Sequence, residues 1–327
     1  RSGGQIIVDA VAQSIGENPP VIDYPKAPRR FGSKSAEEIA CVHVTDVQYG
    51  KRTATYNGTV ADERIALIGR KVEEVTTLRR HHATIRDCRI YLGGDMVEGE
   101  NIFPGQAHEI DQSLFSQALR GLPTALSKLV LHMLRVFEKV TVVGVRGNHG
   151  RPGRFGNGDN RQTNWDTVCF RALELMILGP HCPESVRKRV KFQFSEETFF
   201  QIDRVFDWGN LLVHGDQITG GFAGFPFYGA AKKAWGWIDT LPDAWDYLLC
   251  GHFHTPAAIV LNRRELLAGG TTESDNEYAQ EQLAAGGYPR QRLAYFNAKY
   301  GLISDVPLYL DDSRIPNKLR GRKQGRR

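Results

Sequence analysis

The sequence lacks a long apolar run. No stretch of its 327 residues approaches the roughly 18 consecutive apolar residues that a transmembrane helix requires. The short apolar patch near the start, Ile6–Val11, is interrupted by Asp9 and does not have the pattern of a secretory signal. No internal repeat is visible, which argues against repeat architectures. We therefore expect a protein that does not enter a membrane.

Cysteine is also scarce. The chain has five cysteines, an odd number, and no two of them form a CxxC pair. This pattern argues against a disulfide framework and against a thiolate metal site. Three of them (Cys41, Cys88 and Cys250) lie in or beside apolar runs. We expect buried free thiols in a reducing compartment, and hence a cytoplasmic protein.

Positive charge is concentrated at one end. The net charge is +5, and residues 314–327 contain seven Lys or Arg and no acid. Subtracting these seven charges from +5 leaves −2 for residues 1–313. The tail could hold a polyanion through counterion release, or it could be a solvated end that aids solubility.

The remaining composition is that of an ordinary folded protein, with 41% hydrophobic and 24% charged residues. We predict an N-terminal arm over residues 1–37, one domain over 38–313 and the basic tail over 314–327. The domain begins with alternating strands and helices and continues into a half with more strands. The predicted strands are 39–44, 88–92, 140–145, 191–205, 211–213, 248–250, 257–261, 266–268, 293–297 and 301–310, and the predicted helices are 61–82, 114–137 and 164–178.

Polar residues follow five of these apolar runs. The segments are TDVQYG (45–50), GGDMVEGE (93–100), GNHGR (147–151), VHGD (213–216) and GHFHTP (251–256). In open α/β sheets, ligands bind outside the carboxyl ends of the strands, so these segments could converge on one place. Carboxylate, amide and imidazole groups together are ligands for Mn, Fe or Zn rather than for Ca.

These five segments, in this order, resemble the calcineurin-like metallophosphoesterase family, whose pattern is D-x-H, G-D, G-N-H-D/E, H and G-H-x-H. The resemblance covers roughly residues 38–260. It implies an α/β fold in which two mixed β-sheets pack face to face and are flanked by helices. It also implies two divalent metal ions and attack on phosphorus by a hydroxide that bridges them.

The resemblance also implies roles for individual residues. Asp95 would bridge the metals, and His149 would contact the phosphate and protonate the leaving group. Asn148 would bind a metal and hold the phosphate as well. The full set of implied metal ligands is Asp46, Gln48, Asp95, Asn148, His214, His252 and His254.

The sequence departs from the family pattern in two places. Gln48 stands where the family has a histidine, which should favour a harder ion such as Mn over Zn or Fe, with Mg also an option. Gly150 replaces the acid that follows the catalytic histidine. Glu98 falls where phosphatase-type members have an acid that orients this histidine, and we predict that role for it; the alternative is an exposed glutamate in a loop.

Two further segments have two interpretations each. Arg151 and Arg154, in a glycine-rich stretch, could grip a phosphate oxygen or belong to an ordinary surface loop. Residues 220–229 mix glycine with aromatics and precede Lys232, Lys233, Trp235 and Trp237. Such a segment could stack nucleobases, or it could be a hydrophobic loop that caps the core.

We therefore expect a metal-dependent phosphodiesterase, with DNA or RNA as its partner and substrate. The order of motifs is shared with double-strand-break repair exonucleases, and the basic tail and the aromatic–basic segment favour nucleic acid. The alternatives are a phosphomonoesterase, which the Asp95–Glu98 spacing favours, and a non-catalytic scaffold of the same fold. Gly99 stands where the phosphatases have an arginine after this second acid, which argues against the phosphomonoesterase.

Overall fold

The computed structural model describes residues 13, 22–28, 36–153, 163–220, 225–274 and 287–311. The predicted basic tail, most of the predicted arm and Arg154 lie outside these residues. Within the part that is described, no helix is both long enough and apolar enough to cross a bilayer. All five cysteines are buried and free, as the sequence predicts.

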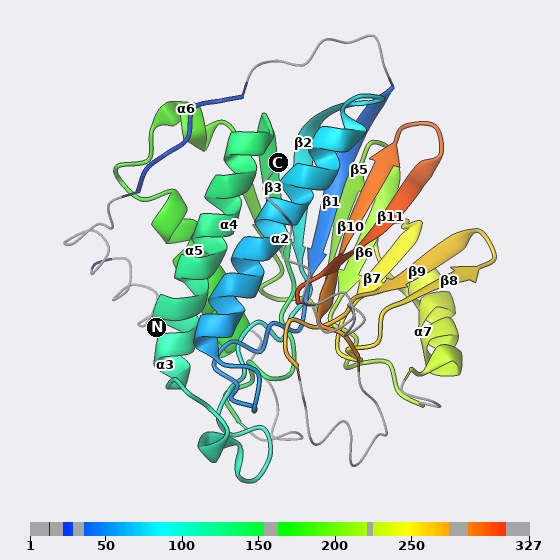
Figure 1. Ribbon diagram of the computed structural model, residues 1–327. Helices are drawn as coiled ribbons and strands as arrows, with labels where there is room; N and C mark the ends of the chain where they lie inside the picture. The colour runs from blue at the N-terminus through cyan, green and yellow to red at the C-terminus, as the bar shows by residue number, and fades with distance from the viewer. Residues whose placement is uncertain are drawn as a thin grey trace, which may run out of the picture.

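Two mixed β-sheets form the centre of the protein (Figure 1). In the six-stranded sheet, with strand order β11-β10-β1-β2-β3-β4, the strands β1 to β4 run parallel. Its strands are β1 (Glu37–Val44), β2 (Thr84–Leu92), β3 (Lys139–Gly144), β4 (Val190–Phe194), β10 (Arg290–Asn297) and β11 (Gly301–Tyr309). The five-stranded sheet has the order β5-β6-β7-β9-β8. Its strands are β5 (Phe200–Val205), β6 (Trp208–Val213), β7 (Tyr247–Cys250), β8 (Ala257–Leu261) and β9 (Arg264–Ala268).

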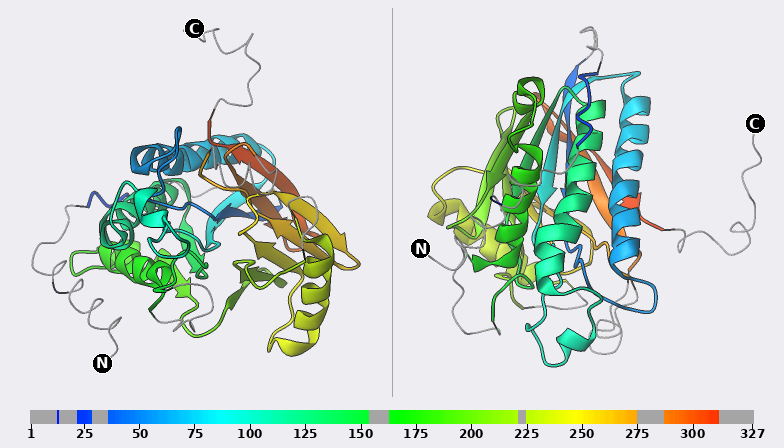
Figure 2. Two further views of the ribbon diagram at one scale, coloured as in Figure 1. Left: turned by 90° about the horizontal axis from the view of Figure 1, so that it is seen from below. Right: turned by 90° about the vertical axis from the view of Figure 1, so that its left-hand side faces the viewer.

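Helices cover the outer faces of both sheets (Figures 1 and 2). The six-stranded sheet is covered by α2 (Gly58–Arg79), α4 (Leu122–Val136) and α5 (Trp165–Ile177), and the five-stranded sheet by α7 (Phe227–Thr240). The shorter elements are α3 (Leu114–Ser116), a π-helical turn at Gln117–Gly121, a 3-10 turn at Gln106–His108, and α6 (Glu184–Arg187).

The alternation of side chains along β1 explains this layering. Ala40 and Val42 pack with the helices, whereas Ile39 and Cys41 pack against residues of the other sheet. A strand with both faces buried has a continuous apolar sequence, which is what residues 39–42 show. The predicted fold class, two mixed sheets face to face with helices outside, is confirmed.

The structure differs from the sequence prediction in two places. The run 191–205, predicted as one strand-like segment, contains β4 and β5, which belong to different sheets. Residues 227–240 form α7, although the sequence was interpreted there only as a loop or a nucleic-acid contact. The spacing of Ala230, Ala234 and Trp237, all buried against the five-stranded sheet, is the helical signal for α7.

Candidate metal centre

The five polar segments follow β1, β2, β3, β6 and β7, and the structure brings them together. Five of the implied ligands have left-handed backbone angles, with φ between 46° and 71°. They are Asp46, Gln48, Asp95, His252 and His254. This conformation costs a non-glycine residue about 1–2 kcal/mol. Strain in five residues after three strands (β1, β2 and β7) is typical of a functional site that the surrounding fold holds in place.

One half of the centre is built around Asp95. Its Oδ2 lies 3.1 Å from Nε2 of His214, and Oδ1 of Asn148 lies 3.1 Å from the same nitrogen. Donor atoms of Asp95, His214 and His252 all lie within 4.8 Å of one another, a spacing that can hold a metal ion. We call these four residues the Asp95 half.

Backbone groups orient the Asp95 half. The Gly93 carbonyl oxygen lies 2.9 Å from Nδ1 of His214, which leaves Nε2 facing Asp95. The His149 backbone N–H donates to Oδ1 of Asp95 at 2.7 Å. Burial lowers the pKa of His214, but the Asp95 carboxylate opposes this and raises it to about 10.

The other half consists of Asp46, Gln48 and His254, which we call the Asp46 half. Nε2 of His254 lies 3.2 Å from Oδ1 of Asp46 and 3.4 Å from Nε2 of Gln48. The Asp46 carboxylate also accepts hydrogen bonds from the Thr45 hydroxyl, at 2.7 Å, and from the His252 backbone N–H, at 2.9 Å. This carboxylate is fully buried, so its orientation is fixed.

His252 connects the two halves, because its side chain lies with Asp95 and His214 while its backbone N–H donates to Asp46. Burial and then the charge on His214 lower the pKa of this imidazole to about 4, although Asp95 and Asp46 both oppose them. A histidine that is neutral near pH 7 has a free lone pair for a metal. The chain therefore brings all seven implied ligands into one centre, and all of them except Gln48 direct a donor atom into it; the Gln48 oxygen lies 3.1 Å from Nζ of Lys51 instead.

His149 lies at the edge of this centre. Its Nδ1 is 2.8 Å from the backbone oxygen of Glu98 and 3.4 Å from the Glu98 carboxylate, while Nε2 is 3.9 Å from Oδ2 of Asp95. Burial lowers the pKa of His149, but Asp95 and then Glu98 more than offset it and raise the pKa to about 9. Glu98 is fully buried and also accepts a hydrogen bond from Gln106, so the exposed-loop alternative for it is wrong.

Two residues outside the five motif segments hold the motif loops in place. Asp166 accepts hydrogen bonds from the backbone N–H groups of Met96, Val97 and Gly147, at 2.8–3.1 Å, and so ties two of the loops together. Gln117, in the π-helical turn, accepts from the backbone N–H groups of Glu98 and Gly99. Both side chains are fully buried. No motif in the sequence points to either of them.

A second pair of residues outside the predicted site, Lys51 and Glu273, belongs to the Asp46 half. Glu273 places Oε1 2.8 Å from Nδ1 of His254, and its Oε2 lies 2.6 Å from Nζ of Lys51. A signal for Glu273 is present in the sequence, because two glycines follow β9 as they follow β2, and Glu273 stands three residues after the second glycine where Asp95 stands directly after it. Lys51 comes directly after the first motif.

Of the two arginines predicted to bind phosphate, Arg151 and Arg154, the structure describes only Arg151. Arg151 is paired with Asp216, with 2.5 Å between Nη2 and Oδ2, and is 19% exposed as a side chain. This pair joins the loop after β3 to the loop after β6. The contact with Asp216 uses Nη2, one of the three nitrogens of the guanidinium. Arg154 lies outside the described residues.

Comparisons with known proteins give only distant likenesses. No family model matches the chain, and no curated protein matches it. Similar solved structures include a predicted phosphoesterase from Streptococcus pneumoniae TIGR4, with 9% identity, 84% of this chain and 99% of the other covered, and a TM-score of 0.31. Vps29 complexed with zinc from Entamoeba histolytica has 10% identity, 83% and 99% coverage, and a TM-score of 0.35. An archaeal phosphodiesterase has 8% identity, 82% and 99% coverage, and a TM-score of 0.35.

Likenesses with TM-scores below 0.5 do not assign an activity, which has to be argued from the residues of the centre itself.

Proposed function

We propose that this chain is a metal-dependent phosphoesterase that hydrolyses phosphodiester bonds in nucleic acid. One observation carries the proposal. Five segments that are far apart in the sequence place carboxylate, imidazole and amide donors in one buried centre, with a charged histidine at its edge. The combination of a metal-ligand set and an acid is what phosphoester hydrolysis requires.

The donor set suits divalent metal ions. The Asp95 half would hold one ion through Asp95, Asn148, His214 and His252, and the Asp46 half is the candidate for a second. Mixed oxygen and nitrogen donors favour Mn, with Fe, Zn and Mg as the other options. Such ions polarise phosphoryl oxygens and make water a nucleophile at neutral pH.

The role of His149 follows from its surroundings. Glu98 accepts at Nδ1, which leaves Nε2 as the nitrogen that faces the centre. Asp95 and then Glu98 raise the pKa of His149, which favours the protonated ring, so that His149 can donate a proton to the departing alkoxide. Glu98 fixes the orientation of the ring and stabilises its charge.

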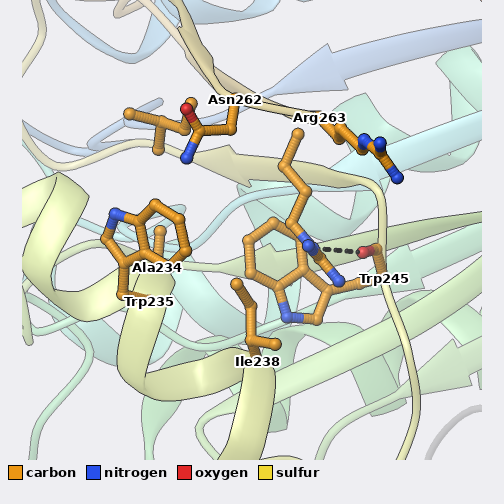
Figure 3. A pocket seen from close by; sticks show the side chains of 8 residues that line it. Ala234, Trp235, Ile238, Trp245, Asn262 and Arg263 are labelled. Carbon is orange, nitrogen blue, oxygen red and sulfur yellow. Dashed lines mark hydrogen bonds between the residues drawn. The ribbon is translucent and has the colours of Figure 1, made fainter.

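The surface beside α7 supports nucleic acid as the substrate. Trp235 on α7 is 53% exposed, whereas Trp237 is buried in the core and is not available to a ligand. A cavity of about 250 Å³ lies between α7 and the β8–β9 hairpin, and Trp235, Arg263 and Arg264 are among the residues that line it (Figure 3). Aromatic and cationic groups side by side can stack a base and hold a phosphate.

A hydrolysis panel tests the proposal. Purified protein with Mn²⁺ would be given bis-p-nitrophenyl phosphate, p-nitrophenyl phosphate, and single- and double-stranded DNA and RNA, with His149→Ala as the control. We expect hydrolysis of the diester and of at least one nucleic acid, both lost in the variant. If His149→Ala hydrolyses the substrates as fast as the wild type, His149 has no part in the mechanism. If the wild type hydrolyses none of the substrates, a non-catalytic scaffold is favoured.

A phosphomonoesterase is the second candidate, and the contact between Glu98 and His149 favours it. The same Asp–Glu spacing occurs in phosphatases, where the acid orients the histidine. Hydrolysis of p-nitrophenyl phosphate alone would select this alternative.

A substitution on α7 tests whether the surface beside this helix binds nucleic acid. Trp235→Ala should weaken binding of single-stranded DNA by about 1–3 kcal/mol, while hydrolysis of the small diester is unchanged. Tyr300→Ala, another exposed aromatic, is the matched control.

A further inference from the structure

Lys51 is a buried cation beside the metal centre. The residue is 7% exposed, and its Nζ lies 2.6 Å from Oε2 of Glu273 and 3.1 Å from Oε1 of Gln48. The ammonium therefore contacts the oxygen of Gln48, which is the atom that would have to bind a metal. A lysine buried between a carboxylate and an amide oxygen is held as a charged group.

This contact fixes the orientation of the Gln48 amide. An ammonium group has only donors, so the oxygen of the amide must face Lys51 and the NH₂ group must face His254. An amide NH₂ group is a donor and offers no lone pair to a metal ion. Gln48 can become a ligand only if it leaves Lys51 and turns its oxygen into the centre.

Glu273 ties Lys51 to the rest of the Asp46 half. One of its oxygens faces Lys51, and the other lies 2.8 Å from Nδ1 of His254. The segment that carries Glu273 is itself anchored to Asp46, because Thr271 Oγ1 and Thr272 N both donate to the Asp46 backbone oxygen, at 2.9 and 3.1 Å. Polar contacts thus connect all residues of the Asp46 half to Glu273 and to the positively charged Lys51.

The Asp95 half is arranged differently. Backbone groups of Gly93 and His149 orient His214 and Asp95, and the Asn148 oxygen faces the centre. The contacts found around Asp95 and His214 join them to histidine, asparagine and backbone groups rather than to a lysine. An ion in the Asp95 half would meet Asp95, Asn148, His214 and His252. An ion in the Asp46 half would meet Asp46, His254 and the shared Asp95, but only the NH₂ group of Gln48, because the Gln48 oxygen contacts the Lys51 ammonium.

We propose that Lys51 acts as a built-in positive charge at the Asp46 half, so that the chain binds one divalent ion tightly in the Asp95 half and a second only weakly. The inference rests on the proposed function, since it concerns the same centre. Two positive groups repel strongly at short range inside a protein, and the ammonium and a second ion would compete for the Gln48 oxygen.

Binding of Mn²⁺ to metal-free protein tests this inference by a readout that does not depend on activity. Isothermal titration would give the affinities, and electron paramagnetic resonance would separate a single Mn²⁺ from a coupled pair. For the wild type we expect one tight ion and a second whose affinity is lower by at least about tenfold. Lys51→Met should bring the second affinity close to the first and produce the coupled signal.

Matched variants separate charge from packing. Lys51→Arg keeps the charge and should keep the single tight ion, and Lys191→Met removes an exposed lysine of β4 and should change neither affinity. If Lys51→Met does not fold, as judged by circular dichroism, Gln48→His provides the second route, because an imidazole does not need the oxygen that Lys51 holds. It should raise the second affinity by at least about tenfold.

Two results would overturn the role of Lys51. These are two ions of equal affinity in the wild type, and a second ion that stays weak in both Lys51→Met and Gln48→His. Asp95→Asn distinguishes this failure from that of the proposed function. If it binds Mn²⁺ as the wild type does, or if the wild type binds none, the metal centre itself is wrong and the inference falls with it.

Discussion

The two halves of the centre come from similar motifs but have different surroundings. Both halves place a strained aspartate at the end of a parallel strand, with φ of 50° for Asp46 and 49° for Asp95. Asp95 contacts histidines and backbone groups, whereas the Asp46 half is connected to the buried Lys51–Glu273 pair. The comparison shows that a ligand motif fixes where a donor lies, while the contacts of that donor decide how well it can bind a cation.

The largest expected effect comes from removing each aspartate in turn. Asp95→Asn should lower kcat/KM for the diester by at least about a thousandfold, since several kcal/mol of stabilisation are lost at 1.36 kcal/mol per tenfold. Asp46→Asn should have a clearly smaller effect, because the half to which it belongs holds its ion less tightly. Steady-state kinetics over a range of Mn²⁺ concentrations measures both. Equal losses would remove the distinction between the halves.

His149→Ala separates chemistry from metal binding. Loss of a general acid should reduce kcat by about 10²–10⁴-fold, while the tight Mn²⁺ ion stays bound, because no ligand atom is removed. The measurements are turnover of the diester and metal content by elemental analysis of the same sample. A variant that loses its metal would place His149 among the ligands.

Glu273→Gln tests whether the two halves bind their ions independently, because it changes only contacts of the Asp46 half. The change leaves Lys51 charged and without its carboxylate partner, and it weakens the hold on Nδ1 of His254. Loss of such a supporting carboxylate lowers metal affinity by about 10–100-fold. Titration with Mn²⁺ should show this loss for the second ion only, with the tight ion unchanged, and an equal loss for both ions would contradict the prediction.

The smallest effect is a shift in pH dependence. Asp95 and then Glu98 raise the pKa of His149, to about 9 in the metal-free protein, which predicts that kcat falls at alkaline pH as the general acid is lost. The same raised pKa adds to the stability of the folded metal-free protein below about 6.5, and this contribution is lost as the pH rises through about 9. Glu98→Gln should move the alkaline limb to lower pH, as measured by pH–rate profiles. An unmoved limb would show that Glu98 does not act on His149.

Local patterns were enough to predict the order of most elements and the place of most donors. Residues 39–44 form a strand because their apolar run is buried on both faces, and the polar residues after it lie at the strand's carboxyl end. Helix α7 was missed because its aromatics and glycines were interpreted as a binding or capping loop, although its alanine and tryptophan spacing is helical. The division of 191–205 between two sheets depends on pairing partners, which the segment itself does not contain.

The sequence by itself determined the ligand types, the positions of the strand-end motifs and the resemblance that they carry, because these depend on residues within a few positions of one another. The tertiary structure decided the contacts of those ligands. In the folded chain, the Gln48 oxygen contacts Lys51, and Glu273 lies between Lys51 and His254. Glu98 is buried against His149, and Arg151 is paired with Asp216. Most of these pairs join separate segments of the chain, and electrostatic interactions between groups depend on distance in space rather than along the sequence.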